Sequence, residues 1–384
     1  MGVTQLIGLA RRGASALAIA AAVLVLPVPS ALAATEFPAG YRGYHTYAET
    51  VAELDAAVAA HPSIVRKFSI GRSYLGRQIW AAKISDNVNT NEYEPEVLFD
   101  GLAHGREHLT VEMGLYILHL LTDNYGSNAR ITRIVNTRET FIVFMLNPDG
   151  GEYDIASGEF RKWRKNRQPA PNSTAIGTDL NRNFGYRWGC CDGSSGDPEE
   201  ETYRGPYAWS TPELAAYRDF VLGRQRNGEQ QITINVSWHS SGKYILWPYG
   251  YTKVDVPATM TVDDHRAFVA LARGAASRNG YTAQQASDLY ITDGVSHDWM
   301  YREQGVFSFV FELGPGGKVD FYPTADRIAR LTSANRGAVL YLLEQADCPW
   351  RAAGLAGVHC TSTTAAVMTY AVSPFFSRLG LGVD

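Results

Sequence analysis

Short apolar runs alternate with turn-forming residues through much of the chain. Between residues 62 and 101, the runs "SIVRKFSIG" (63–71), "RQIWAAKIS" (77–85) and "EVLFDG" (96–101) are separated by Gly, Asn and Pro. Apolar runs of this length between turn formers predict β-strands. Further strands are predicted at three later runs of the same kind: "TFIVFMLNP" (140–148), "QITINVSWH" (231–239) and "VFSFVFEL" (306–313).

Helical spacing of apolar residues recurs between these strands. The clearest case is "TVEMGLYILHLLTDNYG" (110–126), in which Gly126 marks a stop. Similar patterns predict helices over 212–224, 263–278, 294–304 and 325–346. Strands that alternate with helices predict one α/β domain with a central mixed, mostly parallel, twisted sheet and helices on both faces. The region 150–212 predicts long loops, which are more often functional than passive.

The composition is that of an ordinary globular protein. Of 384 residues, 45% are hydrophobic and 19% are charged, which supports a large core and excludes disorder as the default state. The formal charge of -4 supplies no cationic field, and the basic cluster "RKWRKNR" is too short to form a nucleic-acid face. Nucleic acid is therefore not an expected partner.

The first 33 residues have the features of a signal peptide. Arg11 and Arg12 precede the apolar stretch "ASALAIAAAVLVL", and "PVPSALA" ends in the small-x-small pattern of a cleavage site. A membrane anchor is the alternative, but the apolar stretch is shorter than the roughly 20 residues that span a bilayer. We expect secretion, a mature protein that starts near Ala34 and no stable membrane association.

Four cysteines follow this cleavage site, in a compartment that permits disulfides. Their spacing favours a bond between Cys348 and Cys360. Cys190 and Cys191 would then form a bond between neighbours or remain thiols. A zinc–thiolate site is the competing interpretation, although the sequence contains no C-x-x-C pair.

The motif "HGREH", His104 to His108, introduces the chemistry. It can be the inverted zincin motif, in which both histidines are ligands on one helix and Glu107 is the general base. Alternatively, His104 and Glu107 bind a metal and His108 does not, or the histidines only form local hydrogen bonds. Gly105 and the preceding strand place His104 in a turn before the helix, which favours the second interpretation.

Two more polar residues lie at the carboxyl ends of predicted strands, where open α/β sheets collect their ligands. His239 ends "QITINVSWH", and Glu312 lies in "VFSFVFEL", where an unpaired carboxylate would be costly to bury. Taken alone, His239 could be a hydrogen-bonded histidine in a turn, and Glu312 could be a carboxylate in a salt bridge. Because both lie at strand ends equivalent to that of His104, they predict one shared site. Two nitrogens and one carboxylate suit one Zn²⁺ and leave a position for water, as a catalytic zinc site requires.

With these motifs, residues 36–348 resemble the zinc carboxypeptidases of the carboxypeptidase A and B type, and most closely the secreted bacterial carboxypeptidase T-like members. The resemblance implies a catalytic domain over residues 34–348 and a C-terminal extension over 349–384. It makes His104 and Glu107 of "HGRE" and His239 of "WHSS" the zinc ligands, which removes His108 from the ligand set. It also implies that peptide or protein C-termini are the substrate.

The long loops supply residues that bind anions, and the arginine fork suits a terminal carboxylate. By resemblance, Asn181 and Arg182 bind that carboxylate, Arg164 stabilises the oxyanion, Arg106 contacts the substrate further upstream, and Tyr290 closes over the bound terminus. The expected reaction is release of single C-terminal residues, with Glu312 promoting attack of zinc-bound water.

The preferred terminal residue depends on the stretch "DGVSHD". Members that prefer basic residues have a carboxylate in this pocket, whereas Val295 favours apolar or aromatic side chains and Phe321 adds an apolar wall. His297 departs from both patterns. We therefore expect release of hydrophobic or aromatic residues, with broad apolar and basic specificity as the alternative.

Some expectations stand apart from this site. Asp86, Glu92, Glu94 and Glu96 could hold a structural Ca²⁺ or form a solvated acidic loop. Family members commonly carry an inhibitory prosegment, yet here the domain is expected to begin by Tyr44. A monomer is the default oligomeric state.

Two other functions compete with this prediction. A non-catalytic peptide-binding module would be expected to have lost Glu312, Arg164 or a metal ligand. An amidohydrolase of the aspartoacylase type would not need the set of Arg164, Asn181, Arg182 and Tyr290. Because the whole set is present, the sequence favours a carboxypeptidase.

Overall fold

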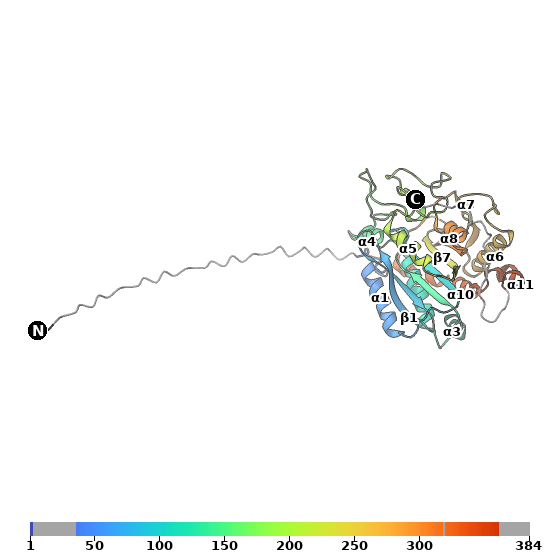
Figure 1. The fold of residues 1–384 in the computed structure, drawn as a ribbon, viewed down its shortest axis with the longest axis horizontal. Coiled ribbons are helices and arrows are strands. Elements are labelled where there is room, and N and C mark those ends of the chain that lie inside the picture. Colours follow the sequence, from blue (N-terminus) through green and yellow to red (C-terminus); the bar gives the residue numbers. More distant parts are fainter. Residues whose placement is uncertain (3–35, 318, 361–384) are drawn as a thin grey trace. The chain divides into compact units, whose positions relative to one another are not determined.

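An eight-stranded mixed sheet forms the centre of the fold (Figure 1) in the order β1-β2-β4-β3-β7-β10-β8-β9. Strands β4, β3, β7 and β10 are parallel neighbours, as are β8 and β9, whereas the pairs β1–β2, β2–β4 and β8–β10 are antiparallel. The predicted mixed, mostly parallel sheet is therefore confirmed. The strands are β1 (Val65–Arg72), β2 (Gln78–Ile84), β3 (Glu96–Asp100), β4 (Glu139–Val143), β7 (Ile232–Ser240), β8 (Tyr244–Trp247), β9 (Thr282–Gln285) and β10 (Phe307–Leu313), and a separate ribbon pairs β5 (Gln225–Arg226) with β6 (Glu229–Gln230).

The computed structural model describes residues 1–2, 36–317 and 319–360, so nearly all of the predicted signal peptide and the tail after Cys360 lie outside the described residues. The helices of the described part are α1 (Tyr47–Ala60), α2 (Leu109–Thr122), α3 (Ala129–Val135), α4 (Pro148–Ile155), α5 (Pro212–Leu222), α6 (Val262–Asn279), α7 (Ala286–Leu289), α8 (Ser296–Gln304), α9 (Ile328–Ser333), α10 (Arg336–Gln345) and α11 (Ala356–His359), with the 3₁₀ turns η1 (Leu180–Arg182), η2 (Ala325–Arg327) and η3 (Pro349–Ala353). None of them has both the length and the apolarity of a membrane span.

Most predicted elements form close to their expected bounds, with two clear exceptions among the helices. The helix expected over 325–346 is three pieces, since η2, α9 and α10 follow one another with a break at Ala334–Asn335. Helix α1 was not among the expected elements. It begins with a capping box in which the Thr46 hydroxyl accepts from the Glu49 backbone while the Glu49 carboxylate accepts from Thr46, and this satisfies two amide groups of the first turn.

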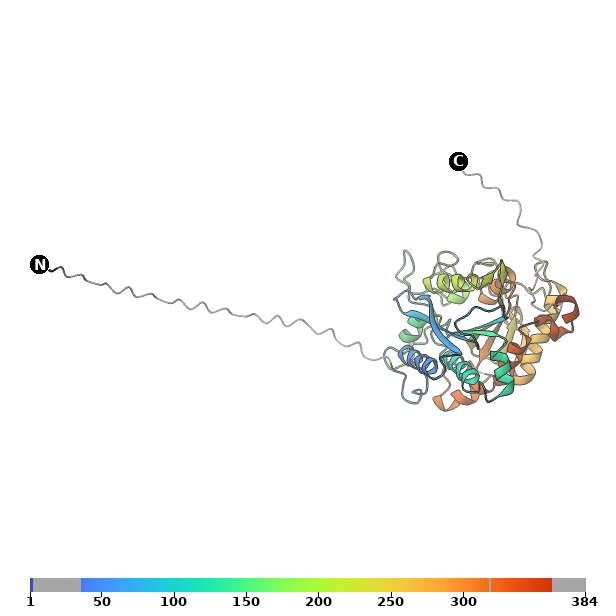
Figure 2. The ribbon, with the colours of Figure 1, turned by 60° about the horizontal axis from the view of Figure 1, so that its bottom comes forward.

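Helices cover both faces of the sheet, as predicted (Figure 2). Along β3, Val97 and Phe99 pack toward a core shared with α1, α2, α6 and α10, whereas Leu98 packs on the other face with α5 and α8. This alternation follows from the two-residue period of a strand, and all of β3 is buried because both faces are covered.

Residues 349–360, which the sequence assigned to a C-terminal extension, pack against the folded unit. The Trp350 ring meets Phe307 edge to face at 4.9 Å between centroids, and its indole nitrogen donates to Asp264 in α6 at 2.8 Å. A disulfide joins Cys348 to Cys360, as the spacing favoured. The compact part of the chain therefore continues to Cys360.

Candidate active site

The three predicted metal ligands meet at the carboxyl ends of neighbouring parallel strands. His104 and Glu107 lie in the turn between β3 and α2, and His239 lies near the end of β7. The Nδ1 atom of His104 is 2.8 Å from Oε1 of Glu107, and Nδ1 of His239 is 3.0 Å from Oε2. All three side chains are buried, so their donor atoms are fixed around one point.

The outer nitrogens of both rings have partners that set the tautomers. Nε2 of His104 faces the Asp179 carboxylate at 3.1 Å, and Nε2 of His239 faces the Ser237 hydroxyl at 3.3 Å. Because the Ser237 hydroxyl itself donates to Asp100 at 2.6 Å, it can accept from His239. A metal bound through both Nδ1 atoms would leave the ring protons on the Nε2 atoms, where Asp179 and Ser237 can accept them, and Nδ2 of Asn181 also lies 3.5 Å from Nε2 of His239.

These tautomers leave three electron-rich groups facing one another. The two Nδ1 atoms are 3.2 Å apart, and the Glu107 carboxylate lies beside both. A dication between these groups would relieve the repulsion, and two imidazoles with one carboxylate are a ligand set of catalytic zinc. The residues present therefore fit Zn²⁺.

His108 points away from this cluster. Its Nε2 atom lies 3.0 Å from Asp154, and its ring packs against Phe37. Helix α2 begins only at Leu109, so His104 and His108 do not lie on one helix as the inverted zincin motif requires. The geometry agrees with the interpretation that excludes His108.

Glu312 lies beside the cluster because β10 and β7 are in register, with Glu312 opposite His239. Its side chain lines the same cavity as the three ligands. Among the described residues its carboxylate has no hydrogen-bond partner. Burial raises the pKa of Glu312 to about 7, with His239 and Arg164 opposing the rise and Glu107 adding to it. A carboxylate with such a pKa can exchange protons near neutral pH.

Arg164 reaches the same cavity and is held by a carboxylate that sequence reasoning missed. Its Nε and Nη2 atoms both donate to Oδ2 of Asp179, at 2.9 and 2.8 Å, which leaves Nη1 without a partner among the described residues. Asp179 thus connects Arg164 to His104. Although burial raises the pKa of Asp179, the charge of the Arg164 guanidinium holds it well below its ordinary value. Its place in "GTDLNRNFG", two residues before Asn181, was the only signal for it.

Asn181 and Arg182 are anchored in η1 and line the cavity. The Asn181 amide oxygen accepts from the Ser296 backbone at 2.9 Å, and Nε of Arg182 donates to the carbonyl of Gly193 at 3.0 Å. Nη1 of Arg182 donates to the Asn181 carbonyl, while Nη2 has no partner among the described residues. Both side chains are therefore held in place with donors to spare.

The cavity has a volume of about 420 Å³, and every residue that the sequence assigned to the site lines it. Tyr290 is 54% exposed in the loop that follows α7. Arg106 lies over the Phe321 ring at 4.4 Å and pairs with Glu201 at 3.0 Å. The apolar residues that line the cavity are Leu246, Ala286, Leu289, Val295, Val310, Val319 and Phe321.

The inner end of the cavity is unexpectedly polar. His297 is buried and neither ring nitrogen forms a hydrogen bond, although Nε2 lies 3.3 Å from Oδ1 of Asp298. The hydroxyl of Thr292, which also lines the cavity, has no partner in the described structure either. Burial, reinforced by His239 and Arg182, lowers the pKa of His297 to about 3, so its ring is neutral. A neutral imidazole can donate and accept one hydrogen bond each.

A second group of acidic residues lies away from this cavity. Oxygen atoms of Asp86, Glu92 and Glu94 lie within 4.8 Å of one another. Burial, with Glu92 and Asp86 adding to it, raises the pKa of Glu94 to about 7. Glu96, which the sequence grouped with these three, is instead buried in β3 and paired with Arg224, whose Nε donates to it at 2.8 Å.

Comparison with known proteins gives one consistent result. The sequence profile described as "Zinc carboxypeptidase" matches residues 50–337. A zinc carboxypeptidase from Saccharothrix mutabilis subsp. capreolus is 48% identical over 83% of this chain and 73% of its own length. Carboxypeptidase A1 from Bos taurus is 31% identical over 79% of this chain and 70% of its own. The crystal structure of thrombin activatable fibrinolysis inhibitor superimposes with a TM-score of 0.72 at 28% identity, over 79% of this chain and 74% of that chain.

Proposed function

Because this chain belongs to the zinc carboxypeptidase family of peptide hydrolases, we propose that it is secreted and releases single residues from peptide C-termini. The observation that carries the proposal is the joint placement of three kinds of group in one cavity: the ligand cluster, the Glu312 carboxylate and the Arg182 guanidinium. A metal site alone would serve many hydrolases. A free arginine donor beside it selects substrates that end in a carboxylate.

In this proposal His104, Glu107 and His239 hold Zn²⁺, which would polarise the scissile carbonyl and activate a water molecule. Glu312 accepts the proton of the attacking water and later delivers it to the leaving amine. Its raised pKa, about 7, suits both steps. The free Nη1 of Arg164 stabilises the oxyanion that develops on the carbonyl oxygen.

The substrate's terminal carboxylate is bound by Arg182 and Asn181. Both residues line the cavity and are buried, and a charge-assisted hydrogen bond from Arg182 is favoured in a largely buried site. Tyr290, exposed and on a loop, closes over the bound terminus, and Arg106 contacts the peptide upstream.

The terminal side chain enters the pocket between the apolar walls and the polar inner end. Val295 and the surrounding apolar residues favour hydrophobic or aromatic side chains. An unpaired buried polar group costs about 1–3 kcal/mol. The inner end of the pocket should therefore bind an aromatic side chain with a hydrogen-bonding group more tightly than one without it. We therefore place tyrosine ahead of phenylalanine among the terminal residues.

We also propose a structural Ca²⁺ at Asp86, Glu92 and Glu94. One oxygen each from Asp86 and Glu94 is buried without a hydrogen-bond partner in the described structure, and hard carboxylate oxygens are the ligands that Ca²⁺ prefers.

The decisive test of the function uses peptides that differ only at the terminus. Free-acid and amidated versions of one peptide are incubated with purified protein, with and without a zinc chelator, and the products are identified by mass spectrometry. We expect chelator-sensitive loss of single residues from the free acids only. Cleavage in mid-chain, or equal cleavage of the amide, would contradict the role given to Arg182.

Substitution of Glu312 by Gln tests the mechanism. It should lower kcat by about 10²–10⁴-fold while zinc stays bound, because only the proton transfer is removed. Glu303→Gln on α8, outside the cavity, is the matched control. A Glu312→Gln variant with wild-type kcat would contradict the role given to Glu312, because the proton transfer would then depend on another group.

A further inference from the structure

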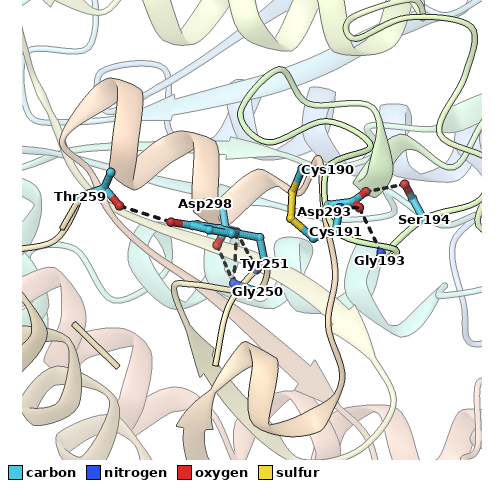
Figure 3. The surroundings of a disulfide bond; sticks show 9 residues. All are labelled: Cys190, Cys191, Gly193, Ser194, Gly250, Tyr251, Thr259, Asp293 and Asp298. Carbon is cyan, nitrogen blue, oxygen red and sulfur yellow. Dashed lines mark hydrogen bonds between the residues drawn. A yellow bond between two sulfur atoms is a disulfide. The ribbon is translucent and has the colours of Figure 1, made fainter. Parts of the chain in front are cut away.

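The bond between Cys190 and Cys191 lies in a loop that is hydrogen-bonded to Asp293 (Figure 3). A disulfide between neighbours closes a small covalent ring that includes the peptide bond joining them, and this restricts the backbone on either side. Cys190 is exposed and Cys191 half-buried, so the bond adds little to the core. Its position therefore calls for an explanation other than packing.

The loop after this bond is attached to one buried carboxylate. The backbone amides of Cys191 and Gly193 each donate to Oδ2 of Asp293 at 3.0 Å, and the Ser194 hydroxyl donates to Oδ1. Figure 3 shows Asp293 between the disulfide and Ser194. Asp293 is fully buried, and a carboxylate that accepts several amide hydrogen bonds is a strong anchor.

The same loop ends on the residue proposed to bind the substrate's carboxylate. The Gly193 carbonyl accepts from Nε of Arg182 at 3.0 Å. Of the contacts that hold the Arg182 guanidinium, this one comes from a separate segment, whereas the other is made to the adjacent carbonyl of Asn181. The direction of the fork therefore depends on where Gly193 lies.

Close backbone packing fixes that position. A Cβ atom at residue 193 would lie 2.4 Å from the carbonyl carbon of Thr292, and one at residue 294 would lie 2.4 Å from the carbonyl oxygen of Arg182. Two glycines thus allow the loop of residues 190–194, the backbone of Arg182 and the loop of residues 292–295 to touch. Thr292 and Val295 of that last loop line the pocket, so the contact also positions pocket wall.

We propose that the Cys190–Cys191 disulfide and Asp293 are positioning elements for Arg182, which they hold in the orientation that binds the terminal carboxylate of the substrate. This inference rests on the proposed carboxypeptidase function. The ring orders the loop so that both amides reach Asp293, and the anchored loop presents the Gly193 carbonyl to Arg182. When the Cys190–Cys191 bond is broken, the Arg182 guanidinium can turn away from the substrate. Binding of the terminal carboxylate then weakens, while the groups that carry out hydrolysis stay in place.

The test compares two disulfides of the same chain. In Cys190→Ser/Cys191→Ser the positioning bond is absent, and in the matched control Cys348→Ser/Cys360→Ser a bond is removed that touches no residue of the cavity. The first variant should show KM raised about tenfold with kcat within about twofold of wild type, since a misplaced guanidinium loses most of one charge-assisted hydrogen bond. The control should keep the wild-type KM.

Product inhibition isolates the carboxylate. Free phenylalanine should inhibit the first variant about tenfold more weakly than it inhibits wild type, whereas inhibition by phenylalaninamide should be equal, because the amide offers no carboxylate to Arg182. Asp293→Ala should give the same pattern, since it removes the acceptor to which the Cys191 and Gly193 amides and the Ser194 hydroxyl all donate.

A dithiol provides an independent route if the serine variants fail to fold. It reduces Cys190–Cys191 to two thiols with two electrons and two protons and is itself oxidised to a cyclic disulfide. Treatment of wild type should raise KM as the substitutions do, and treatment of Cys190→Ser/Cys191→Ser should change KM no further.

Equal KM and equal inhibition constants in wild type and Cys190→Ser/Cys191→Ser would overturn the inference, as would an equal rise in the control. Failure of the proposed function looks different, because wild type itself would then not distinguish free-acid from amidated peptides.

Discussion

Asp179→Asn is the substitution that most directly tests how the site is held together. Its carboxylate faces Nε2 of His104 at 3.1 Å and receives two hydrogen bonds from Arg164 at 2.9 and 2.8 Å. Asparagine has nearly the same shape but no charge, and its amide nitrogen is a donor. One of the two contacts therefore becomes donor to donor, whichever way the amide turns.

The effects of Asp179→Asn on zinc affinity and on kcat can both be estimated. Loss of a carboxylate behind a ligating histidine lowers metal affinity by about 10–100-fold. With zinc at saturation, a displaced Arg164 lowers kcat by up to about 10²–10³-fold, the effect of losing one oxyanion donor. The variant should therefore bind zinc more weakly and stay slow when zinc is restored.

The assay is zinc competition against a chromophoric chelator, followed by kcat and KM at saturating zinc. Asp149→Asn is the matched control, because Asp149 is also buried and accepts from the Leu75 backbone and from Arg77 at 2.7 Å each, yet lines no part of the cavity. Both variants should lose stability, but only Asp179→Asn should lose zinc. If Asp179→Asn holds zinc within about twofold of wild type and keeps its kcat, the link through Asp179 is wrong.

Three further outcomes follow from the structure. Wild type should cleave terminal tyrosine about 5–30-fold better than phenylalanine, as measured by kcat/KM. His297→Leu should abolish that preference, because it removes the imidazole nitrogens proposed to bind the phenol, and it should not slow the release of phenylalanine. Burial raises the pKa of Asp298 from 3.8 to about 7, so the folded state binds the proton more tightly than the unfolded state, and this group's contribution to stability should fall as pH rises from about 4 to 7. Urea unfolding should show that slope in wild type but not in Asp298→Asn, and parallel slopes would refute the assignment. Added Ca²⁺ should raise Tm in wild type but not in Asp86→Asn/Glu92→Gln, and an equal rise in both would remove the proposed site.

The parts of the site that could be predicted from sequence are those carried by strands. A strand is read from its own local pattern, and parallel neighbours bring their carboxyl ends to one edge, so His239 and Glu312 could be placed together before any contact was known. The same reasoning placed His104 and Glu107 in the turn after β3. The family resemblance supplied roles for the loop residues, and each of those residues does line the cavity.

What sequence could not predict depends on contacts between loops. Asp179 and Asp293 stand in polar loops among many other acidic residues, and only the folded chain shows that one faces His104 while the other receives the loop of Cys190 and Cys191. The acidic run 86–96 illustrates the opposite error. Its charges looked like one group, but Glu96 belongs to β3 and its side chain pairs with Arg224, 128 positions away.

The residues proposed to catalyse hydrolysis lie at strand ends, whereas those proposed to select the substrate lie on loops. The proposed zinc ligands and Glu312 lie in or directly after neighbouring strands of the central sheet, whose register is set by burial on both faces. The groups proposed to recognise the substrate, Arg182, Thr292 and Tyr290, lie on loops that are held by a few polar contacts and by the glycines that let backbones touch. Substitutions in those loops can therefore change which C-terminus is bound while the hydrolytic groups remain in place, and the polar inner end of the pocket is one such variation on an unchanged reaction.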